Sequence, residues 1–220
     1  GRPGRLLEAR DTRRQRLELA AGPPFALYAD GRLSASIPDP WQVAPAAHLA
    51  LLLHPEPRHV LVVGGLASGA LEVMLRHPLE QLAAVETDPG LTSLLAVRVA
   101  PHCPLGLTDP RVMLVAADPL AAAAARQDLD LIVLGDGDPV TLRAHRTRSL
   151  EFFRACRGAL AADGLLLVPV GVPDTYLGGI GGELLATTVA TLRASFARVV
   201  AVPGERVLLV AGGAAAELSL

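Results

Sequence analysis

Short, unbroken apolar segments alternate with helical segments from residue 59 onward, and this rhythm limits the possible folds more than any other feature. Apolar runs that lack a polar residue at every second position are typical of strands covered on both faces. Strands that alternate with helices form a largely parallel sheet. The strands predicted on this ground are His59–Val63, Gln81–Glu86, Arg111–Val115, Leu129–Leu134 and Leu165–Val170.

The two ends of the chain follow different patterns. The closing strands, Arg198–Val202 and Arg206–Val210, are separated only by a short turn and must be antiparallel to each other. Near the N-terminus, short strand-like runs flank Asp30-Gly31, a dipeptide typical of a two-residue hairpin. We therefore predict an N-terminal β-appendage over residues 1–40 and an α/β domain over residues 41–220.

Composition excludes several classes of protein. Hydrophobic residues make up 51% of the chain and charged residues 19%, which allows a large core. A net charge of −2 does not suggest a nucleic-acid partner. The apolar runs are shorter than the roughly 18 residues of a membrane span. The sequence opens at Gly1 rather than Met, so we expect a piece of a longer protein, which could carry a membrane segment elsewhere.

The cysteines and histidines show no metal-ligand spacing. Cys103 and Cys156 form no C-x-x-C pair, and the six histidines are scattered. Buried free thiols in a reducing, cytoplasmic setting are the favoured interpretation, although a disulfide stays open at this point. We expect no metal site.

A glycine-rich turn follows the first strand of the predicted sheet. Gly64, Gly65 and Gly69 lie between the apolar run Val60–Val63 and a predicted helix, Ala70–His77. Glycines at such a turn let the backbone approach a nucleotide closely, and the helix start supplies free N–H groups. The alternative is an ordinary tight turn with no ligand.

Acidic residues follow the next strands of the sheet. Glu86 ends the second strand, where a carboxylate accepts ribose hydroxyls in dinucleotide-binding folds. Asp118 follows the third strand and precedes Pro, which is also the signature of a helix N-cap. Asp88 has the same cap signature, and we assign it no ligand role.

Two further acids, Asp136 and Asp138, follow the fourth strand within Gly135–Pro139. At the carboxyl edge of the sheet they could bind a cation or take a proton from an amine. The alternative is an acidic turn, which Gly, Asp and Pro favour by themselves.

Several segments together resemble the spermidine synthase family. The resemblance runs from about residue 13 to residue 210. The C-terminal part of the chain resembles the bacterial branch of the family that is often fused to membrane segments. The whole resemblance is carried by LYADGRL at 27–33 with Asp39, HPEPRHVLVVGG at 54–65, VETDP at 85–89, LDLIV at 129–133 with Asp138-Pro139, and Pro173–Leu177, Phe196 and Pro203-Gly204.

This resemblance implies a class I methyltransferase-like, Rossmann-like sheet of seven strands, a homodimer, and decarboxylated S-adenosylmethionine as the aminopropyl donor. No tightly bound cofactor is implied. Glu86 would bind the ribose and Asp118 the adenine amine, and Gln15 would lie near the donor. The predicted ligand is thus a small-molecule nucleoside.

The chain also departs from the family. Ala67 and Gly135 stand where the family places acids, and residues 41–45 contain neither the expected Tyr nor the expected Glu. Asp138 is the acceptor-facing acid that remains, and Asp136 lies one residue after the expected base. Three arginines, Arg143, Arg146 and Arg148, lie beside the implied acceptor entrance. Arginines repel polyamines, by about 1 kcal/mol per close pair in water.

Three functions therefore remain open. The first is a divergent aminopropyltransferase in which Asp136 or Asp138 supplies the base. The second is a nucleoside-binding or structural module without catalysis. The third is a methyltransferase that uses S-adenosylmethionine itself, because Ala67 offers no anion to a donor amine.

Overall fold

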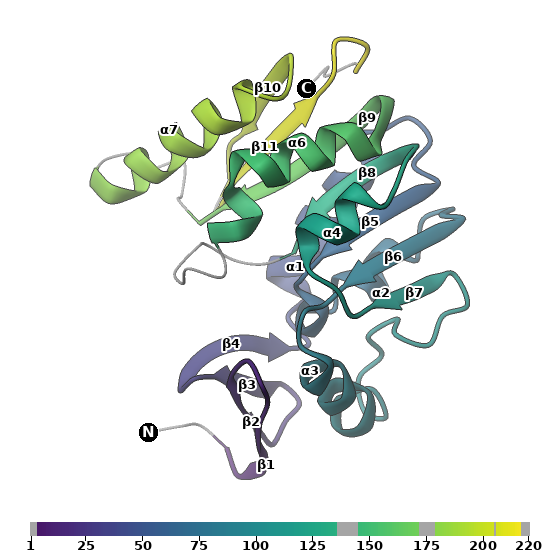
Figure 1. Ribbon diagram of the computed structural model, residues 1–220. Coiled ribbons are helices and arrows are strands. Elements are labelled where there is room, and N and C mark those ends of the chain that lie inside the picture. The colour runs from purple at the N-terminus through teal and green to yellow at the C-terminus, as the bar shows by residue number, and fades with distance from the viewer. Residues whose placement is uncertain (1–3, 136–144, 172–178, 205, 217–220) are drawn as a thin grey trace.

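The computed structural model describes residues 4–135, 145–171, 179–204 and 206–216. A seven-stranded sheet forms its centre, in the order β10-β11-β9-β8-β5-β6-β7 (Figure 1). Strands β5 to β9 run parallel, and β11 is antiparallel to both of its neighbours. The strands are β5 (His59–Val63), β6 (Gln81–Val85), β7 (Val112–Val115), β8 (Leu129–Leu134), β9 (Leu160–Val170), β10 (Arg198–Val202) and β11 (Val207–Gly212). The mostly parallel seven-stranded sheet predicted from the sequence is confirmed.

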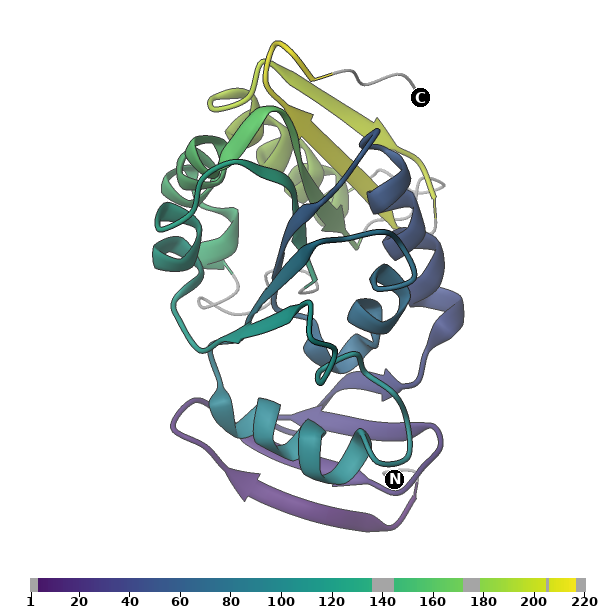
Figure 2. The same ribbon diagram turned by 90° about the vertical axis from the view of Figure 1, so that its right-hand side faces the viewer.

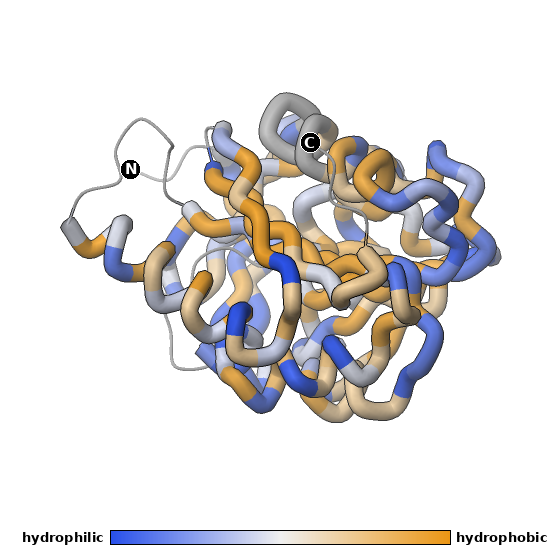
Figure 3. The backbone as a smooth tube through the Cα atoms, turned by 90° about the horizontal axis from the view of Figure 1, so that it is seen from above, coloured by the Kyte–Doolittle hydropathy of each residue, from blue (hydrophilic) through white to orange (hydrophobic). Residues whose placement is uncertain are grey.

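Helices cover both faces of this sheet because alternate apolar residues of each strand point to opposite sides. Val60 and Val62 belong to one buried cluster, together with α1 (Pro40–Leu52) and α2 (Ala70–Met74). Leu61 and Val63 belong to the other cluster. The helices of that second face are α4 (Pro119–Ala124), α6 (Leu150–Ala159) and α7 (Gly179–Arg193). Figure 3 shows the apolar segments running through the middle of the molecule.

The N-terminal strands form a separate antiparallel sheet in the order β1-β2-β3-β4. They are β1 (Leu6–Asp11), β2 (Arg16–Ala20), β3 (Phe25–Ala29) and β4 (Arg32–Ile37). Both residues of the β3–β4 turn are left-handed, with φ of 50° at Asp30 and 78° at Gly31, so the predicted hairpin is confirmed. Sequence analysis missed β1, because this edge strand is largely exposed and shows no apolar alternation.

The small sheet is joined to the α/β part by a shared core. Leu17, Leu19, Phe25, Leu27 and Ile37 are buried in the same cluster as α1 and α2. Figures 1 and 2 show this sheet beside α3 (Pro89–Leu94), below the large sheet. The division of the chain at residue 40 stays a prediction.

Both cysteines are free and buried, as the sequence predicted. Burial raises the pKa of the Cys156 thiol, which lies on α6, and so suppresses its reactive thiolate. Among the described helices, none combines the length and the apolar character that a bilayer crossing requires.

Candidate functional site

The carboxyl ends of the parallel strands β5, β6, β7 and β8 meet at one edge of the large sheet. Chain order reverses between β5 and β8, since β6 and β7 lie on one side of β5 and β8 lies on the other. Pairing continues just past the strand ends: the Gly64 N–H donates to Val85 O at 2.9 Å, and the Gly135 N–H donates to Val63 O at 2.9 Å. In open α/β sheets, ligands bind in the crevice at such a reversal point.

The glycine turn occupies this reversal point. Gly64, Gly65 and Gly69 have φ of 71°, 73° and 81°, a conformation that other residues rarely adopt. A Cβ at Gly65 would lie 2.5 Å from the Gly135 carbonyl oxygen, and a Cβ at Gly135 would lie 2.6 Å from that of Gly64. The two backbones therefore touch. This contact explains Gly65 and Gly135 without any ligand, so the tight-turn interpretation keeps physical support.

Next to this turn, the Glu86 carboxylate is held at the end of β6. Its Oε1 accepts a hydrogen bond from the Asp88 backbone N–H at 2.9 Å. The side chain is only partly buried. An oriented carboxylate at the end of the second strand suits the recognition of a ribose diol.

Gln15 reaches the same point from the N-terminal sheet. Its side-chain amide donates from Nε2 to Asp88 Oδ2 at 3.1 Å. Gln15 and Glu86 therefore contact the same residue, although one lies in the β1–β2 turn and the other at the large sheet. That Gln15 lies near a bound donor stays a prediction.

Asp118 caps α4, as its sequence indicates, with its Oδ1 accepting from the Leu120 N–H at 3.0 Å. Its Oδ2 forms an ion pair with Arg146 Nη2 at 3.0 Å. The side chains are 37% and 66% exposed, so water screens this pair strongly. Sequence analysis placed Arg146 near the acceptor entrance. The structure pairs it with the acid expected to bind adenine.

The positions that carry the catalytic hypotheses fall into two groups. Asp136, Asp138 and Arg143 lie outside the described residues. Ala67 is 6% exposed, in the short helical turn that follows Gly65, and contributes no charge. Arg148 is described: its Nη2 donates to Pro169 O at 2.7 Å, at the carboxyl end of β9. Among the described residues, no three His, Cys, Asp or Glu side chains gather as metal ligands would.

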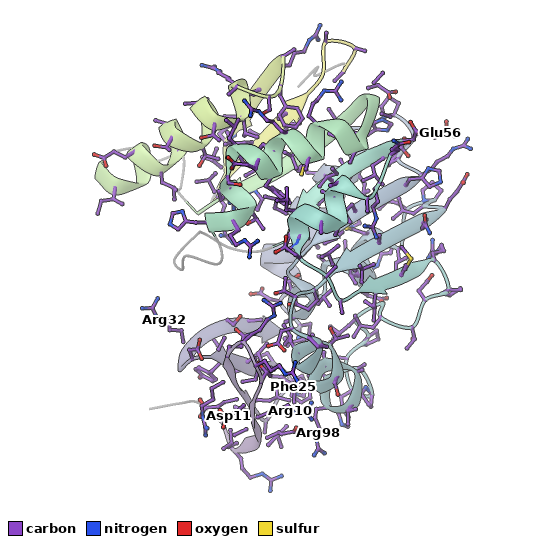
Figure 4. All side chains as sticks on the ribbon, in the orientation of Figure 1. Arg10, Asp11, Phe25, Arg32, Glu56 and Arg98 are labelled. Carbon is purple, nitrogen blue, oxygen red and sulfur yellow. The ribbon has the colours of Figure 1, made fainter. Side chains whose placement is uncertain are left out.

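A polar junction joins the N-terminal sheet to the helical segment behind Asp88. Glu8 Oε2 accepts from Arg98 Nε at 2.6 Å, and Glu8 Oε1 accepts from Arg10 Nη2 at 2.7 Å. Arg98 first, and then Arg10, hold the pKa of the Glu8 carboxyl below its ordinary value. Figure 4 shows Arg10 and Arg98 at this junction, with Glu56 at the far end of the molecule. The junction fixes the small sheet beside α3.

Comparison with known proteins agrees with this architecture. A model of the spermine/spermidine synthase domain matches residues 45–173, which include the glycine turn, Glu86 and Asp118. The chain belongs to the spermine/spermidine synthase family. The segment from β5 to β8, where the candidate site residues follow the strands, lies wholly within the matched region.

The relatives of the chain include curated aminopropyltransferases. A polyamine aminopropyltransferase from Nitrosomonas europaea is 31% identical over 187 residues, which cover 83% of this chain and 57% of that protein. One from Thermotoga petrophila is 30% identical over 120 residues, which cover 54% and 40%. The chain thus matches only part of the length of these relatives. A solved spermidine synthase in complex with the transition-state analogue AdoDATO superposes with a TM-score of 0.79 at 23% identity, covering 94% of this chain and 73% of that one.

Sequence analysis missed two residues at this edge. Thr12 gave no signal, because a lone Thr in an Arg-rich turn has many roles. Asp88 was assigned to capping alone, since an Asp-Pro pair before a helix explains itself locally. Thr12 Oγ1 donates to Asp88 Oδ2 at 2.8 Å across 76 positions of the chain, and no local pattern encodes such a contact.

Proposed function

We propose that the chain binds an adenosine thioether or sulfonium at the carboxyl edge of its large sheet. Candidate ligands are decarboxylated S-adenosylmethionine, S-adenosylmethionine and methylthioadenosine, each as co-substrate or product rather than as a tightly held cofactor. One observation carries this proposal: next to the glycine turn, Glu86 and Gln15 both form hydrogen bonds with Asp88. Family membership supports the same ligand class.

Each contact has a proposed role. Glu86 binds the ribose by accepting from its diol, and the backbone of Gly64 and Gly65 lines the path of the ligand. Gln15 bonds the ligand from the side of the small sheet. Asp118 accepts the exocyclic amine of adenine, which requires its carboxylate to be shared with Arg146 or released by it.

We further propose that polyamine aminopropyl transfer is weak or lost. In this reaction an amine nitrogen bonds to the carbon next to the sulfonium, the carbon–sulfur bond breaks, methylthioadenosine leaves, and the amine loses a proton. The ammonium of a free amine has a pKa near that of Lys, about 10.4, so a positioned base is required. Such a base typically contributes about 10²–10⁴-fold.

The described residues support weak transfer because neither family acid is present. Ala67 and Gly135 supply no carboxylate, and Arg146 places a positive charge beside Asp118. Asp136 and Asp138 stay the proposed substitutes for the base. A non-catalytic nucleoside-binding module is the second candidate, and these same absent acids favour it. A methyltransferase using S-adenosylmethionine is the third, because Ala67 offers no anion to a donor amine.

Calorimetry with the three adenosine ligands tests the proposed binding. We expect at least one to bind, and Glu86→Ala to weaken it by about 1–3 kcal/mol, or about 5- to 150-fold in Kd, because a ligand hydroxyl loses its partner. Glu80→Ala is the matched control, since this acid lies before β6 at the opposite edge and its side chain is 55% exposed. If all three ligands fail to bind at millimolar concentration, a structural role replaces the proposal.

Product analysis with the three ligands separates the candidate reactions. We expect little or no spermidine from putrescine and decarboxylated S-adenosylmethionine. Robust transfer that Asp136→Asn abolishes would contradict the proposal of lost activity and identify Asp136 as the base. Transfer of a methyl group to an acceptor would favour the methyltransferase, and binding without turnover would favour the non-catalytic module.

We also propose a homodimer that uses the small sheet. Leu6 and Leu33 lie on its two edge strands, with 53% and 61% of their surface exposed. Open edges with apolar side chains favour a covering partner. Light scattering at tens of micromolar protein tests this, and a monomer there would contradict it.

A further inference from the structure

Asp88 carries a carboxylate that is almost fully buried, which is rare for Asp. It is 2% exposed and lies directly beyond the carboxyl end of β6, two residues after Glu86. A buried carboxylate is strongly unfavourable unless other groups donate hydrogen bonds to it. The donors around Asp88 therefore indicate what the residue does.

Those donors come from two parts of the molecule. From its own helix, the Gly90 N–H donates to Oδ1 at 3.0 Å, which is the local cap. From the N-terminal sheet, Thr12 Oγ1 donates to Oδ2 at 2.8 Å and Gln15 Nε2 donates to the same oxygen at 3.1 Å. One oxygen of Asp88 thus completes the helix, and the other binds the β1–β2 turn.

The turn itself is fixed against this carboxylate. The Arg14 and Gln15 backbone N–H groups both donate to Thr12 Oγ1 at 3.0 Å, which closes the turn. A Cβ at Gly90 would lie 2.5 Å from Thr12 Cγ2, so the turn and the helix start are in direct contact. Gln15 therefore has a defined place beside the residue that begins helix α3.

The chemistry of the contact also fixes the Gln15 amide. An ionised carboxylate only accepts hydrogen bonds, so the NH₂ group must face Asp88 and the amide oxygen must point elsewhere. Asp88 in addition donates its own backbone N–H to Glu86 Oε1. Asp88 thus orients two groups that can accept hydrogen bonds: the Gln15 amide oxygen on the small sheet and the Glu86 carboxylate on the large sheet.

We propose that Asp88 is a positioning residue of the nucleoside site, which holds the Gln15 amide oxygen and the Glu86 carboxylate so that each accepts from one of the two ribose hydroxyls. The inference rests on the proposed function and deepens it. It assigns to the N-terminal sheet a part in ligand recognition, which Asp88 transmits without touching the ligand.

Exchanging the amide and the acid tests this role. Asp88→Asn keeps the helix cap, because Asn caps as well as Asp, but its NH₂ then faces the NH₂ of Gln15. Gln15→Glu places two carboxylates together, which repel each other. We expect each change to weaken methylthioadenosine binding about tenfold. In the doubly exchanged protein the new amide at position 88 donates to the new carboxylate at position 15, and the Thr12 hydroxyl turns its hydrogen to the residue 15 carbonyl oxygen, 2.9 Å away. An acceptor oxygen again faces the ligand, and affinity recovers to within about threefold of wild type.

Ser149→Ala is the control for a general loss of stability. Ser149 caps α6 by accepting from the Phe152 N–H at 3.2 Å, on the other face of the sheet. We expect it to lower the midpoint of thermal unfolding and leave affinity unchanged. The test still works if Asp88→Asn alone unfolds, because the doubly exchanged protein restores the hydrogen bond between positions 15 and 88.

The outcomes separate this inference from the proposed function. If wild type binds and the doubly exchanged protein shows the product of the two single losses, Asp88 is a cap and the positioning role is wrong. Unchanged affinity in Asp88→Asn overturns the role as well. If wild type binds none of the adenosine ligands, the proposed function fails and the positioning role fails with it.

Discussion

Asp88 and Asp118 begin from the same local sequence and end in different environments. Each precedes Pro, each accepts a hydrogen bond from the N–H two residues ahead, and each caps a helix of six residues. Asp88 is 2% exposed and holds the β1–β2 turn. Asp118 has a 37% exposed side chain and pairs with Arg146.

The difference shows that capping and site chemistry are separate properties of one residue. The cap requires only the chain two residues ahead, so both Asp-Pro pairs form it. The second carboxylate oxygen is free for whichever group the fold brings close. At Asp88 the fold brings neutral donors into a dry contact, and at Asp118 it brings a solvated guanidinium.

The largest expected effect is on stability, when Asp88 and Asp118 are each replaced by Ala. Asp88→Ala loses a cap and leaves the Thr12 and Gln15 donors without their acceptor, so we expect a loss of about 2–4 kcal/mol in the free energy of unfolding. Asp118→Ala loses a cap and a screened ion pair, for about 1 kcal/mol. Urea denaturation measures both. Equal losses would mean that the contacts with the small sheet add nothing to stability.

A smaller effect concerns the position beyond β8, where the family places an acid. Gly135→Ala should destabilise by about 1–3 kcal/mol, because its Cβ meets the Gly64 carbonyl oxygen at 2.6 Å. Gly158→Ala, in α6 with no atom within 4 Å of its Cβ, should stabilise by about 0.5–1 kcal/mol. Thermal unfolding distinguishes the two signs.

The same contact bears on the proposal that aminopropyl transfer is weak. Gly135→Asp combined with Ala67→Asp would restore the family acids, but Gly135→Asp also requires the Gly64–Gly65 backbone to move. We therefore expect this double variant to transfer aminopropyl groups no faster than wild type. Faster aminopropyl transfer in that double variant would show that the Gly64–Gly65 backbone can move at a small cost in free energy.

The smallest expected effect concerns Arg146, the exposed partner of Asp118, and tests the contrast with the buried contacts of Asp88. Arg146→Ala should change stability by less than about 1 kcal/mol, because the ion pair with Asp118 is exposed. Removing the competing guanidinium should strengthen nucleoside binding by up to about fivefold at low salt. Calorimetry at low and high NaCl should show that this gain in affinity shrinks as salt is added. The losses of affinity caused by Asp88→Asn and Gln15→Glu should not change with salt. A gain independent of salt would contradict a screened ion pair.

Much of the fold follows from local signals. The apolar runs His59–Val63 and Leu129–Leu134 were predicted with the bounds that the structure gives them. The Asp30-Gly31 hairpin follows from left-handed residues that few other dipeptides tolerate. Where local signals are weak the prediction fails: the exposed strand β1 was missed, and α2 ends at Met74 rather than at His77.

The sequence by itself determined the parallel sheet, the two helix caps, the glycine turn and the family, because each depends on residues close together in the chain. Only the tertiary structure decided what the caps are used for. Gln15 and Asp88 are 73 residues apart, and Gly65 and Gly135 meet through backbone atoms that no side-chain pattern encodes. Contacts of this kind depend on how separate elements are placed in space. The same Asp-Pro signature therefore gives a buried junction at Asp88 and an exposed ion pair at Asp118.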